Sequence, residues 1–286
     1  TTASLMTGKR VWTHQTYHVG DSSKPVKGST ENLPLLLRNN GYYTMAFITT
    51  RFASVKTLGI ANSFDTAPLV ADFRAPHSLY GIIDKLLSRL FEDKIKLYDW
   101  FIKEDFIIYR LLNIIGFSET ETPPEEAFNK FLTVIDNHPS EPFFVWIHLF
   151  PPHHPYLPPE PYMGMFDSSS ALRTSNSQMA KERLMLKNQQ RQSQGIQPMV
   201  KVSRARYDEF IRYCDKEFED FIAQLETRNR LQNTLVILSS DHGESFEHNC
   251  IGHVCDELYE QLTHIPLIIK EPNQSKGQII NDVIEQ

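Results

Sequence analysis

Residues 234–244 read TLVILSSDHGE, an apolar run that ends in Asp241, His242 and Gly243. The run over 234–238 predicts a buried β-strand, because it is short, continuous and rich in β-branched residues. In an open α/β sheet, ligands bind beyond the carboxyl ends of the strands, and a glycine there allows close backbone approach. A carboxylate oxygen and an imidazole nitrogen form a ligand pair for a divalent cation. The stretch therefore predicts an α/β fold with a metal-binding pair at the sheet edge, although a strand-end Asp also commonly caps the following helix.

The rest of the chain continues the α/β pattern. A short helix is expected between the capping residues 29–31 and Gly41, and it leads directly into an apolar strand. A helix that runs into an apolar strand is half of a βαβ unit, so we predict a mostly parallel central sheet flanked by helices. The expected strands are 43–50, 142–150, 234–238 and 265–270, and further helices are expected over 123–137 and 204–228.

Two stretches depart from this alternation. Residues 78–117 carry apolar residues at helical spacing, which predicts a helical insertion. Its charged positions mix acids and bases, which favours a packed helical pair over a membrane-surface segment. Residues 167–202 are rich in Ser, Gln, Arg and Lys and predict a polar surface excursion that is partly helical near 180–190. We interpret 1–286 as a single α/β domain that is truncated.

The composition excludes several classes of protein. Hydrophobic residues make up 41% of the 286 residues, which is enough for a sizeable core. The formal net charge is -6 without a long run of Lys or Arg, so we expect no nucleic-acid partner. The sequence holds no apolar stretch long enough to span a bilayer, so a membrane anchor would lie outside it.

Histidines gather after two of the expected strands, and these windows hold seven of the eleven in the chain. They are His148, His153 and His154 in the first window, and His242, His248, His253 and His264 in the second. Random placement rarely produces such a pattern, so it favours a functional site over simple helix capping by Asp241.

Two cysteines, Cys250 and Cys255, flank His253 and raise the alternative of a zinc site that includes His248. Their spacing matches no common structural zinc pattern. We therefore expect a free pair of thiols or one small disulfide.

The order and spacing of these motifs resemble the sulfatase family of the alkaline-phosphatase-like superfamily. DHGE at 241–244, followed by Glu247-His248, His253, LYE at 258–260 and IPLII at 265–269, is similar to the metal-binding stretch of that family. FVWIHLFPPHHPY at 144–156 resembles the family's strand that ends in a His and continues into a Pro-His-x-Pro-Tyr turn. ASLMTG at 3–8, with His14, resembles the helix that follows the family's nucleophile.

This resemblance implies an alkaline-phosphatase-like fold and a metal-dependent hydrolase of sulfate esters. Asp241 and His242 would hold the divalent metal. Of His153 and His253, one would contact the ester oxygens and the other would protonate the leaving group. The remaining histidines of the two windows are expected to be ordinary core or surface residues.

By the same register, the family's nucleophile and first acidic metal-binding pair would precede Thr1, and a small C-terminal subdomain would follow Gln286. We therefore expect a fragment that is inactive alone. Thr1 and Thr2 lie too late in the register to be the nucleophile and are expected to cap a helix. By family habit, the parent protein would be periplasmic, membrane-anchored or secreted.

The resemblance leaves alternatives open. It implies calcium first, but imidazole ligands suit manganese or zinc better. His242 stands where many sulfatases have Asn, and no Gly-Lys-Trp-His segment follows 43–50. A phosphodiesterase, phosphonate monoester hydrolase or phosphoethanolamine-type transferase acting on phosphate esters therefore remains an alternative. A noncatalytic member that binds an anionic ligand is a further one.

Overall fold

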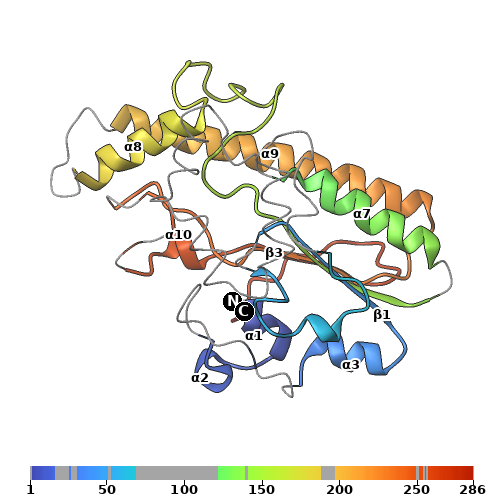
Figure 1. Cartoon of the computed structure of the whole chain (residues 1–286). Coiled ribbons are helices and arrows are strands. Elements are labelled where there is room, and N and C mark those ends of the chain that lie inside the picture. The colour runs from blue at the N-terminus through green and yellow to red at the C-terminus, as the bar shows by residue number, and fades with distance from the viewer. Residues whose placement is uncertain are drawn as a thin grey trace, which may run out of the picture. The chain divides into compact units, whose positions relative to one another are not determined.

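The computed structural model describes residues 2–16, 26, 31–50, 53–68, 122–138, 141–187, 197–248, 251–253, 255 and 257–285. The chain divides into two compact units, Thr1–Phe150 and Pro151–Gln286, whose elements are labelled in Figure 1. The predicted helical insertion over 78–117 lies outside the described residues. The interpretation of the chain as a single domain stays a prediction.

The first unit is built on a parallel pair of strands. Strand β1 (Tyr43–Ile48) pairs with β2 (Phe143–His148), with Tyr43 opposite Phe143 and Ile48 opposite His148. Helix α7 (Pro124–Asn137) directly precedes β2, and it begins with a proline and two glutamates in its first turn, as helix N-termini favour. The prediction of strands arranged in parallel, each preceded by a helix, is confirmed for this unit.

Helices cover both faces of β1. Ala46 and Ile48 point into a buried cluster that includes Ala3 and Met6 of helix α1 (Thr2–Thr7). Phe47 faces the other way, and its ring centroid lies 6.0 Å from that of Phe131 on α7. This alternation follows from the two-residue period of a strand. A strand that is apolar on both faces therefore forms the middle layer of an α/β unit.

Shorter helices complete the first unit. They are α2 (Val11–His14), α3 (Leu33–Asn39) and the 3-10 helix η2 (Ala61–Ser63). The N-cap of α3 is Asn32, whose side chain accepts a hydrogen bond from the Leu35 amide at 3.0 Å, rather than a residue of 29–31. Gly41 follows α3 with a φ of +83°, so the predicted glycine stop is confirmed.

Asp65 joins α3 to β1 and supports a stability prediction. Its carboxylate accepts hydrogen bonds from the Arg38 Nε at 2.8 Å and from the backbone amide and hydroxyl of Thr44 at 2.9 Å each. Burial alone would raise the pKa of Asp65, but these hydrogen bonds and the Arg38 charge bring it below the usual value. We expect Asp65→Ala to lower the free energy of unfolding by about 2 kcal/mol at neutral pH.

This effect should depend on pH with a defined sign. Because folding depresses the pKa, the contribution of Asp65 is complete above the unfolded-state pKa and is lost as the pH falls through the folded-state pKa. Urea unfolding followed by tryptophan fluorescence measures it, since all three tryptophans fall within the first 150 residues of the sequence. An Asp65→Ala penalty that does not shrink on acidification would contradict this assignment.

The second unit contains an antiparallel pair, β3 (Val236–Ser239) and β4 (Leu267–Lys270), in which Val236 lies opposite Lys270. We expected a buried strand at 234–238, but Leu235 and Ile237 are 53% and 59% exposed. Among the described residues β3 has β4 as its one strand neighbour, so its apolar side chains are only partly covered.

The helices of this unit are α8 (Ser175–Lys187), α9 (Gln197–Thr227) and α10 (Glu260–Thr263). Phe210 and Tyr213 of α9 form a buried cluster with Tyr156. The polar stretch 167–202 includes α8, and two of its polar side chains, Gln178 and Lys181, are 0% and 1% exposed. No described helix combines the length and the apolar character that a membrane span requires.

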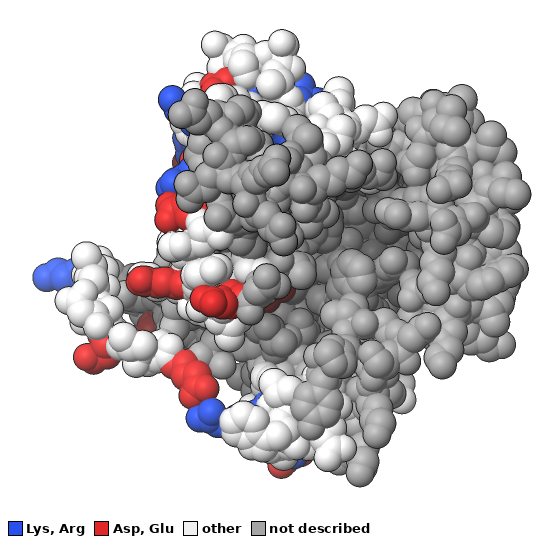
Figure 2. Space-filling view, turned by 90° about the vertical axis from the view of Figure 1, so that its left-hand side faces the viewer, with Lys and Arg blue, Asp and Glu red and all other residues white. Residues whose placement is uncertain are grey.

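Acidic and basic side chains lie interspersed over the described residues of the face shown in Figure 2. This mixture agrees with the modest net charge of -6. No broad basic patch is visible among the described residues in that view.

Candidate metal centre

The loop after β3 is held close to α10 by a glycine. The Gly243 amide donates to the Leu262 carbonyl at 2.8 Å, and a Cβ at this position would lie only 2.0 Å from the Gln261 carbonyl oxygen. Any side chain here would therefore collide with backbone. The sequence prediction that this glycine permits close backbone approach is confirmed.

A second backbone contact returns the chain to the same place. Ser245 and Gly252 exchange two backbone hydrogen bonds, of 2.9 and 3.0 Å, in an isolated antiparallel bridge. Gly252 has a φ of +103°, a conformation that favours glycine. The bridge brings His253, which follows Gly252, back beside Glu244, which precedes Ser245.

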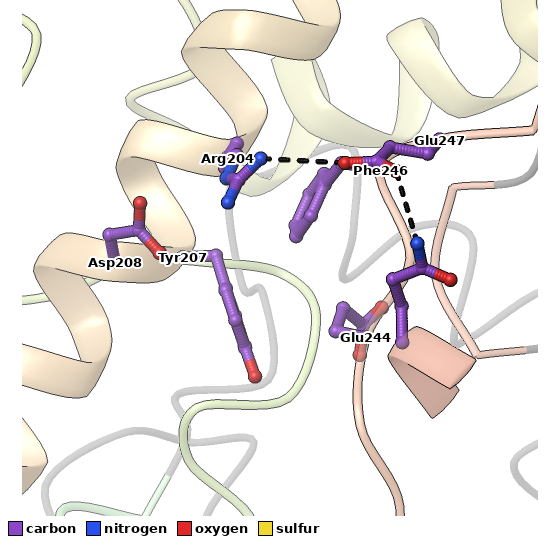
Figure 3. Close-up of a pocket in the computed structure, with 7 residues that line it drawn as sticks. Arg204, Tyr207, Asp208, Glu244, Phe246 and Glu247 are labelled. Carbon is purple, nitrogen blue, oxygen red and sulfur yellow. Dashed lines mark hydrogen bonds and ion pairs between the residues drawn. The ribbon is translucent and has the colours of Figure 1, made fainter. Parts of the chain in front are cut away.

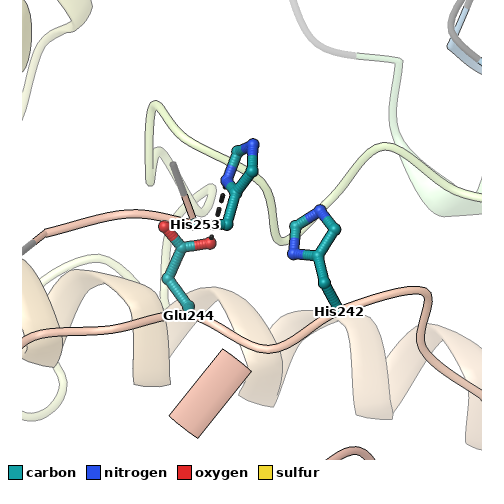
Figure 4. Close-up of side chains that lie close together, drawn as sticks. All are labelled: His242, Glu244 and His253. Carbon is teal, nitrogen blue, oxygen red and sulfur yellow. Dashed lines mark ion pairs between the residues drawn. The ribbon is translucent and has the colours of Figure 1, made fainter. Parts of the chain in front are cut away.

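The result is a group of three potential metal ligands, His242, Glu244 and His253. One donor atom from each lies within 4.8 Å of the others. The Glu244 Oε2 is 3.6 Å from the His253 Nδ1, and the two imidazole rings stack with centroids 4.3 Å apart. Figure 4 shows the carboxylate pointing to His253, with the His242 ring beside it. Two imidazoles and a carboxylate are a donor set that suits a divalent transition metal.

The tautomer of His242 leaves a nitrogen available. Its Nδ1 lies 2.8 Å from the Gly243 carbonyl oxygen, which can only accept, so Nδ1 carries the proton. In the neutral ring this leaves Nε2 as the nitrogen that could bind a metal, and the hydrogen bond at the other nitrogen orients the ring.

Asp241 lies at the edge of this group. Its Oδ1 is 3.9 Å from the His242 Nε2, and its side chain is 38% exposed. Glu244, rather than Asp241, is the carboxylate grouped with the two stacked imidazoles, and its oxygens face His253 and Tyr156. The DHGE motif contains Glu244, but the motif alone assigns this residue no role. Its contact with His253 depends on the return of the chain at Gly252, which a linear pattern does not show.

Glu244 is buried and charged. Its side chain is 4% exposed, and it accepts a 2.7 Å hydrogen bond from the Tyr156 hydroxyl. Burial would raise the pKa of Glu244, but the facing His253 and the hydrogen bond from Tyr156 outweigh it and hold the pKa below the usual value. At neutral pH this carboxylate is therefore ionised, which favours a cation beside it.

His153, one of the two predicted catalytic residues, lies next to the other. Its ring centroid is 4.8 Å from that of His253. Its Nδ1 donates to the His154 carbonyl at 2.6 Å, which fixes the orientation of the ring. Burial lowers the pKa of His153, so this imidazole is neutral near pH 7. The structure thus brings the predicted residues His153, His242 and His253 together, with Asp241 beside His242.

The histidines without an expected role occupy varied positions. Burial, with Lys181 next, lowers the pKa of His154 to about 4. His248 stacks on Tyr259 with centroids 4.4 Å apart, and His264 is an exposed residue whose Nδ1 is 3.6 Å from Glu260. His148 is the last residue of β2, in the first unit.

Cys255 is part of a disulfide. A disulfide sulfur carries no thiolate, so Cys255 is not a zinc ligand in this state. The structure therefore gives no support to the zinc site that the cysteine spacing raised.

Glu244 also lines a small pocket (Figure 3). The Glu247 carboxylate closes one side by accepting from the Gln261 side chain at 3.0 Å and lying 3.8 Å from Arg204. Burial, with Glu244 and Asp208 next, raises the pKa of Tyr207 to about 12, so its phenol stays protonated. The pocket is lined by Arg204, Tyr207, Asp208, Glu244, Phe246, Glu247 and Gln261.

The fold matches that of alkaline-phosphatase-like hydrolases. The phosphonate monoester hydrolase of Agrobacterium radiobacter aligns with a TM-score of 0.59 at 21% identity, over 95% of this chain and 58% of that chain. The predicted fold class, a mostly parallel α/β sheet flanked by helices and alkaline-phosphatase-like, is confirmed.

The family follows from the sequence comparison. The profile of the Sulfatase family matches residues 1–286, so the chain belongs to that family. It is 23% identical over 184 residues to an arylsulfatase of Clostridium perfringens, covering 59% of this chain and 37% of that protein. It is 26% identical over 169 residues to the multifunctional alkaline phosphatase superfamily protein PehA of Trinickia caryophylli, covering 52% of this chain and 32% of that protein.

Sulfatases are generally metal-dependent, and the donor set at His242, Glu244 and His253 fits that property. The chain spans well under two thirds of the length of these relatives. The resemblance read from the DHGE and PHHPY motifs is confirmed at the level of the family.

Proposed function

We propose that this protein is a metal-dependent hydrolase of sulfate esters. The observation that carries the proposal is the convergence of His153, His242, Glu244 and His253 in a chain of the Sulfatase family. Imidazoles from two segments far apart in the sequence meet beside a buried, ionised carboxylate. A purely structural role would not require so many titratable groups in one place, so their convergence favours a functional site.

Asp241 and His242 are proposed as metal ligands, and Glu244 is added to them. The His242 Nδ1 is held on the Gly243 carbonyl, so Nε2 is the nitrogen proposed to bind the metal, and Asp241 approaches that same atom at 3.9 Å. Glu244 contributes a second negative charge that stays ionised at neutral pH. A bound divalent cation would supply Lewis-acid polarisation of the ester and neutralise its oxygens.

His253 and His153 are proposed to act on the ester itself. His253 lies 3.6 Å from the Glu244 carboxylate, which orients the ring and balances a positive charge on it. We assign to it the contact with the anionic ester oxygens. We assign to His153 the transfer of a proton to the leaving group from Nε2, since its Nδ1 is held on the His154 carbonyl. Because burial lowers the pKa of His153, Nε2 must first take up that proton before it can donate it.

The donor set bears on the identity of the metal. Calcium prefers six to eight oxygen ligands, whereas imidazole suits manganese and zinc. With the His242 imidazole among the proposed ligands, we propose manganese or zinc ahead of calcium.

The same nitrogen donors favour a second candidate function, the hydrolysis of phosphate diesters or phosphonate monoesters. The phosphonate monoester hydrolase of Agrobacterium radiobacter shares the fold, and PehA is described as a multifunctional member of the alkaline phosphatase superfamily. A phosphoethanolamine-type transferase belongs to the same alternative, because it would use a similar metal on a phosphate ester. A noncatalytic anion-binding protein is the remaining one.

Paired substrates distinguish these functions. We expect the full-length protein, stripped of metal and resupplied with calcium, manganese or zinc, to hydrolyse an aryl sulfate faster than a matched aryl phosphodiester. Both reactions are followed by release of the same phenol, so their kcat/KM values compare directly. Faster turnover of the phosphodiester would favour the second candidate function. Turnover of neither ester would favour the noncatalytic anion-binding protein.

A further inference from the structure

Tyr156 lies against the candidate metal centre but outside the predicted set. It is 1% exposed, and its hydroxyl donates to the Glu244 Oε1 at 2.7 Å. The other oxygen of that carboxylate, Oε2, faces His253 at 3.6 Å. Tyr156 and His253 therefore share the two oxygens of Glu244, so the direction of the phenol determines which way the carboxylate points.

Tyr156 itself is fixed at its backbone. The Gln178 side chain accepts from the Tyr156 amide at 2.8 Å and donates to the Tyr156 carbonyl at 2.7 Å. Gln178 is 0% exposed and also donates to the Leu172 carbonyl at 3.1 Å. The side-chain amide of Gln178 thus bonds both backbone polar groups of Tyr156, as a neighbouring β-strand would, and fixes the backbone of Tyr156.

The ring of Tyr156 is enclosed by its neighbours. Tyr207 and Phe246 pack on it with centroids 5.4 and 5.8 Å away, and His154 meets it edge-on at 5.3 Å. The Lys181 ammonium lies 5.8 Å from the ring centroid, within cation–π range. The phenol therefore has little freedom to turn away from Glu244.

Two of the residues that restrain Tyr156, Gln178 and Lys181, belong to helix α8. The Lys181 Nζ also donates to the Ser203 hydroxyl on α9 at 2.5 Å, and Lys181 is 1% exposed. A buried lysine is costly unless its charge is well partnered, so its presence here indicates a structural requirement. The segment expected to be a polar excursion thus supplies the frame of the site.

We propose that Tyr156 is a positioning residue that orients the Glu244 carboxylate toward His253. Gln178 and Lys181 of α8 hold Tyr156 in the direction that this requires. The part of the inference that concerns a metal rests on the proposed function, whereas the orientation of Glu244 does not. Groups that orient ligands in this way typically affect metal affinity by about 10- to 100-fold.

Tyr156→Phe tests the inference because it keeps the ring and removes only the hydroxyl. We expect a change in the ring ¹⁵N chemical shifts of His253 in NMR spectra of the metal-free protein. Calorimetric titration with Mn²⁺ and with Zn²⁺ should show an affinity about 10-fold or more below that of the wild type. Tyr162→Phe is the matched control, since it removes a phenol from the same cluster, where Tyr162 packs against Tyr213 at 5.4 Å.

A Glu244→Ala background shows whether Tyr156 acts through Glu244. In that background, Tyr156→Phe should cause no further loss of metal affinity, whereas a general packing defect would persist. Unchanged His253 signals in Tyr156→Phe, or equal changes in Tyr162→Phe, would overturn the inference. A wild-type protein that binds neither metal would instead refute the metal-dependent function, and the His253 signals would still decide the role of Tyr156.

Discussion

Asp241→Ala and His242→Ala are each expected to lower kcat/KM for ester hydrolysis by about a thousandfold or more. Loss of a metal ligand removes several kcal/mol of transition-state stabilisation, and each 1.4 kcal/mol corresponds to a factor of ten. The Nε2 of His242 and the Oδ1 of Asp241 lie 3.9 Å apart, so either change removes half of the proposed pair. Initial rates with the better of the two aryl esters, measured beside metal content, give both numbers.

His264→Ala is the matched control for this result. His264 belongs to the same window of histidines as His242 and caps α10, but its side chain is 80% exposed and its Nδ1 lies 3.6 Å from Glu260. We expect its kcat/KM and metal content to remain at wild-type level. If Asp241→Ala kept full activity while His242→Ala and Glu244→Gln lost metal, the ligand set would be His242, Glu244 and His253 without Asp241.

Local patterns in the sequence predicted the two described strands of the first unit. Strands were expected at 43–50 and 142–150 and are found at Tyr43–Ile48 and Phe143–His148. Each is a continuous apolar run covered on both sides, so composition alone identifies it. Where burial depends on distant partners, as for Ile237 on β3, the same kind of run proved half exposed.

The candidate site could be predicted only in part, because some of its contacts join residues that are far apart in the sequence. His242 and His253 belong to one segment, and the gathering of histidines could be counted. The partnership of Glu244 with Tyr156 joins residues 88 positions apart and depends on two backbone contacts, at Gly243 and Gly252. Glutamine is usually a surface residue, and only the folded chain shows that Gln178 is buried.

Arg206 and Glu209 show how a pattern can mislead. They are three residues apart on α9, a spacing that usually describes a solvated ion pair on a helix surface. Both are 0% exposed. The Arg206 guanidinium donates to Glu209 at 2.9 Å and to the carbonyls of Asp167 and Ser169 at 2.8 and 2.9 Å. Charge periodicity does not reveal this burial, because the loop that covers the pair lies about forty positions earlier in the sequence.

Glu209→Ala is therefore expected to destabilise the second unit by about 3–5 kcal/mol, because it leaves the buried Arg206 without its counter-ion. Glu209 also accepts hydrogen bonds from the Gly164, Phe166 and Asp167 amides, at 3.0, 2.9 and 3.1 Å. Burial would raise the pKa of Glu209, but these bonds hold it below the usual value. Its contribution is complete above the unfolded-state pKa and is lost on acidification through the folded-state pKa.

Asp215→Ala provides an internal comparison on the same helix. Arg212 and Asp215 have the same three-residue spacing and the same 2.9 Å distance, but they are 50% and 67% exposed. The expected loss is below about 1 kcal/mol, since an exposed ion pair gains little over its hydration. Hydrogen exchange of α9 amides measures both variants, because tryptophan fluorescence reports only the first unit. Equal effects of the two substitutions would mean that burial does not set the strength of the Arg206–Glu209 pair.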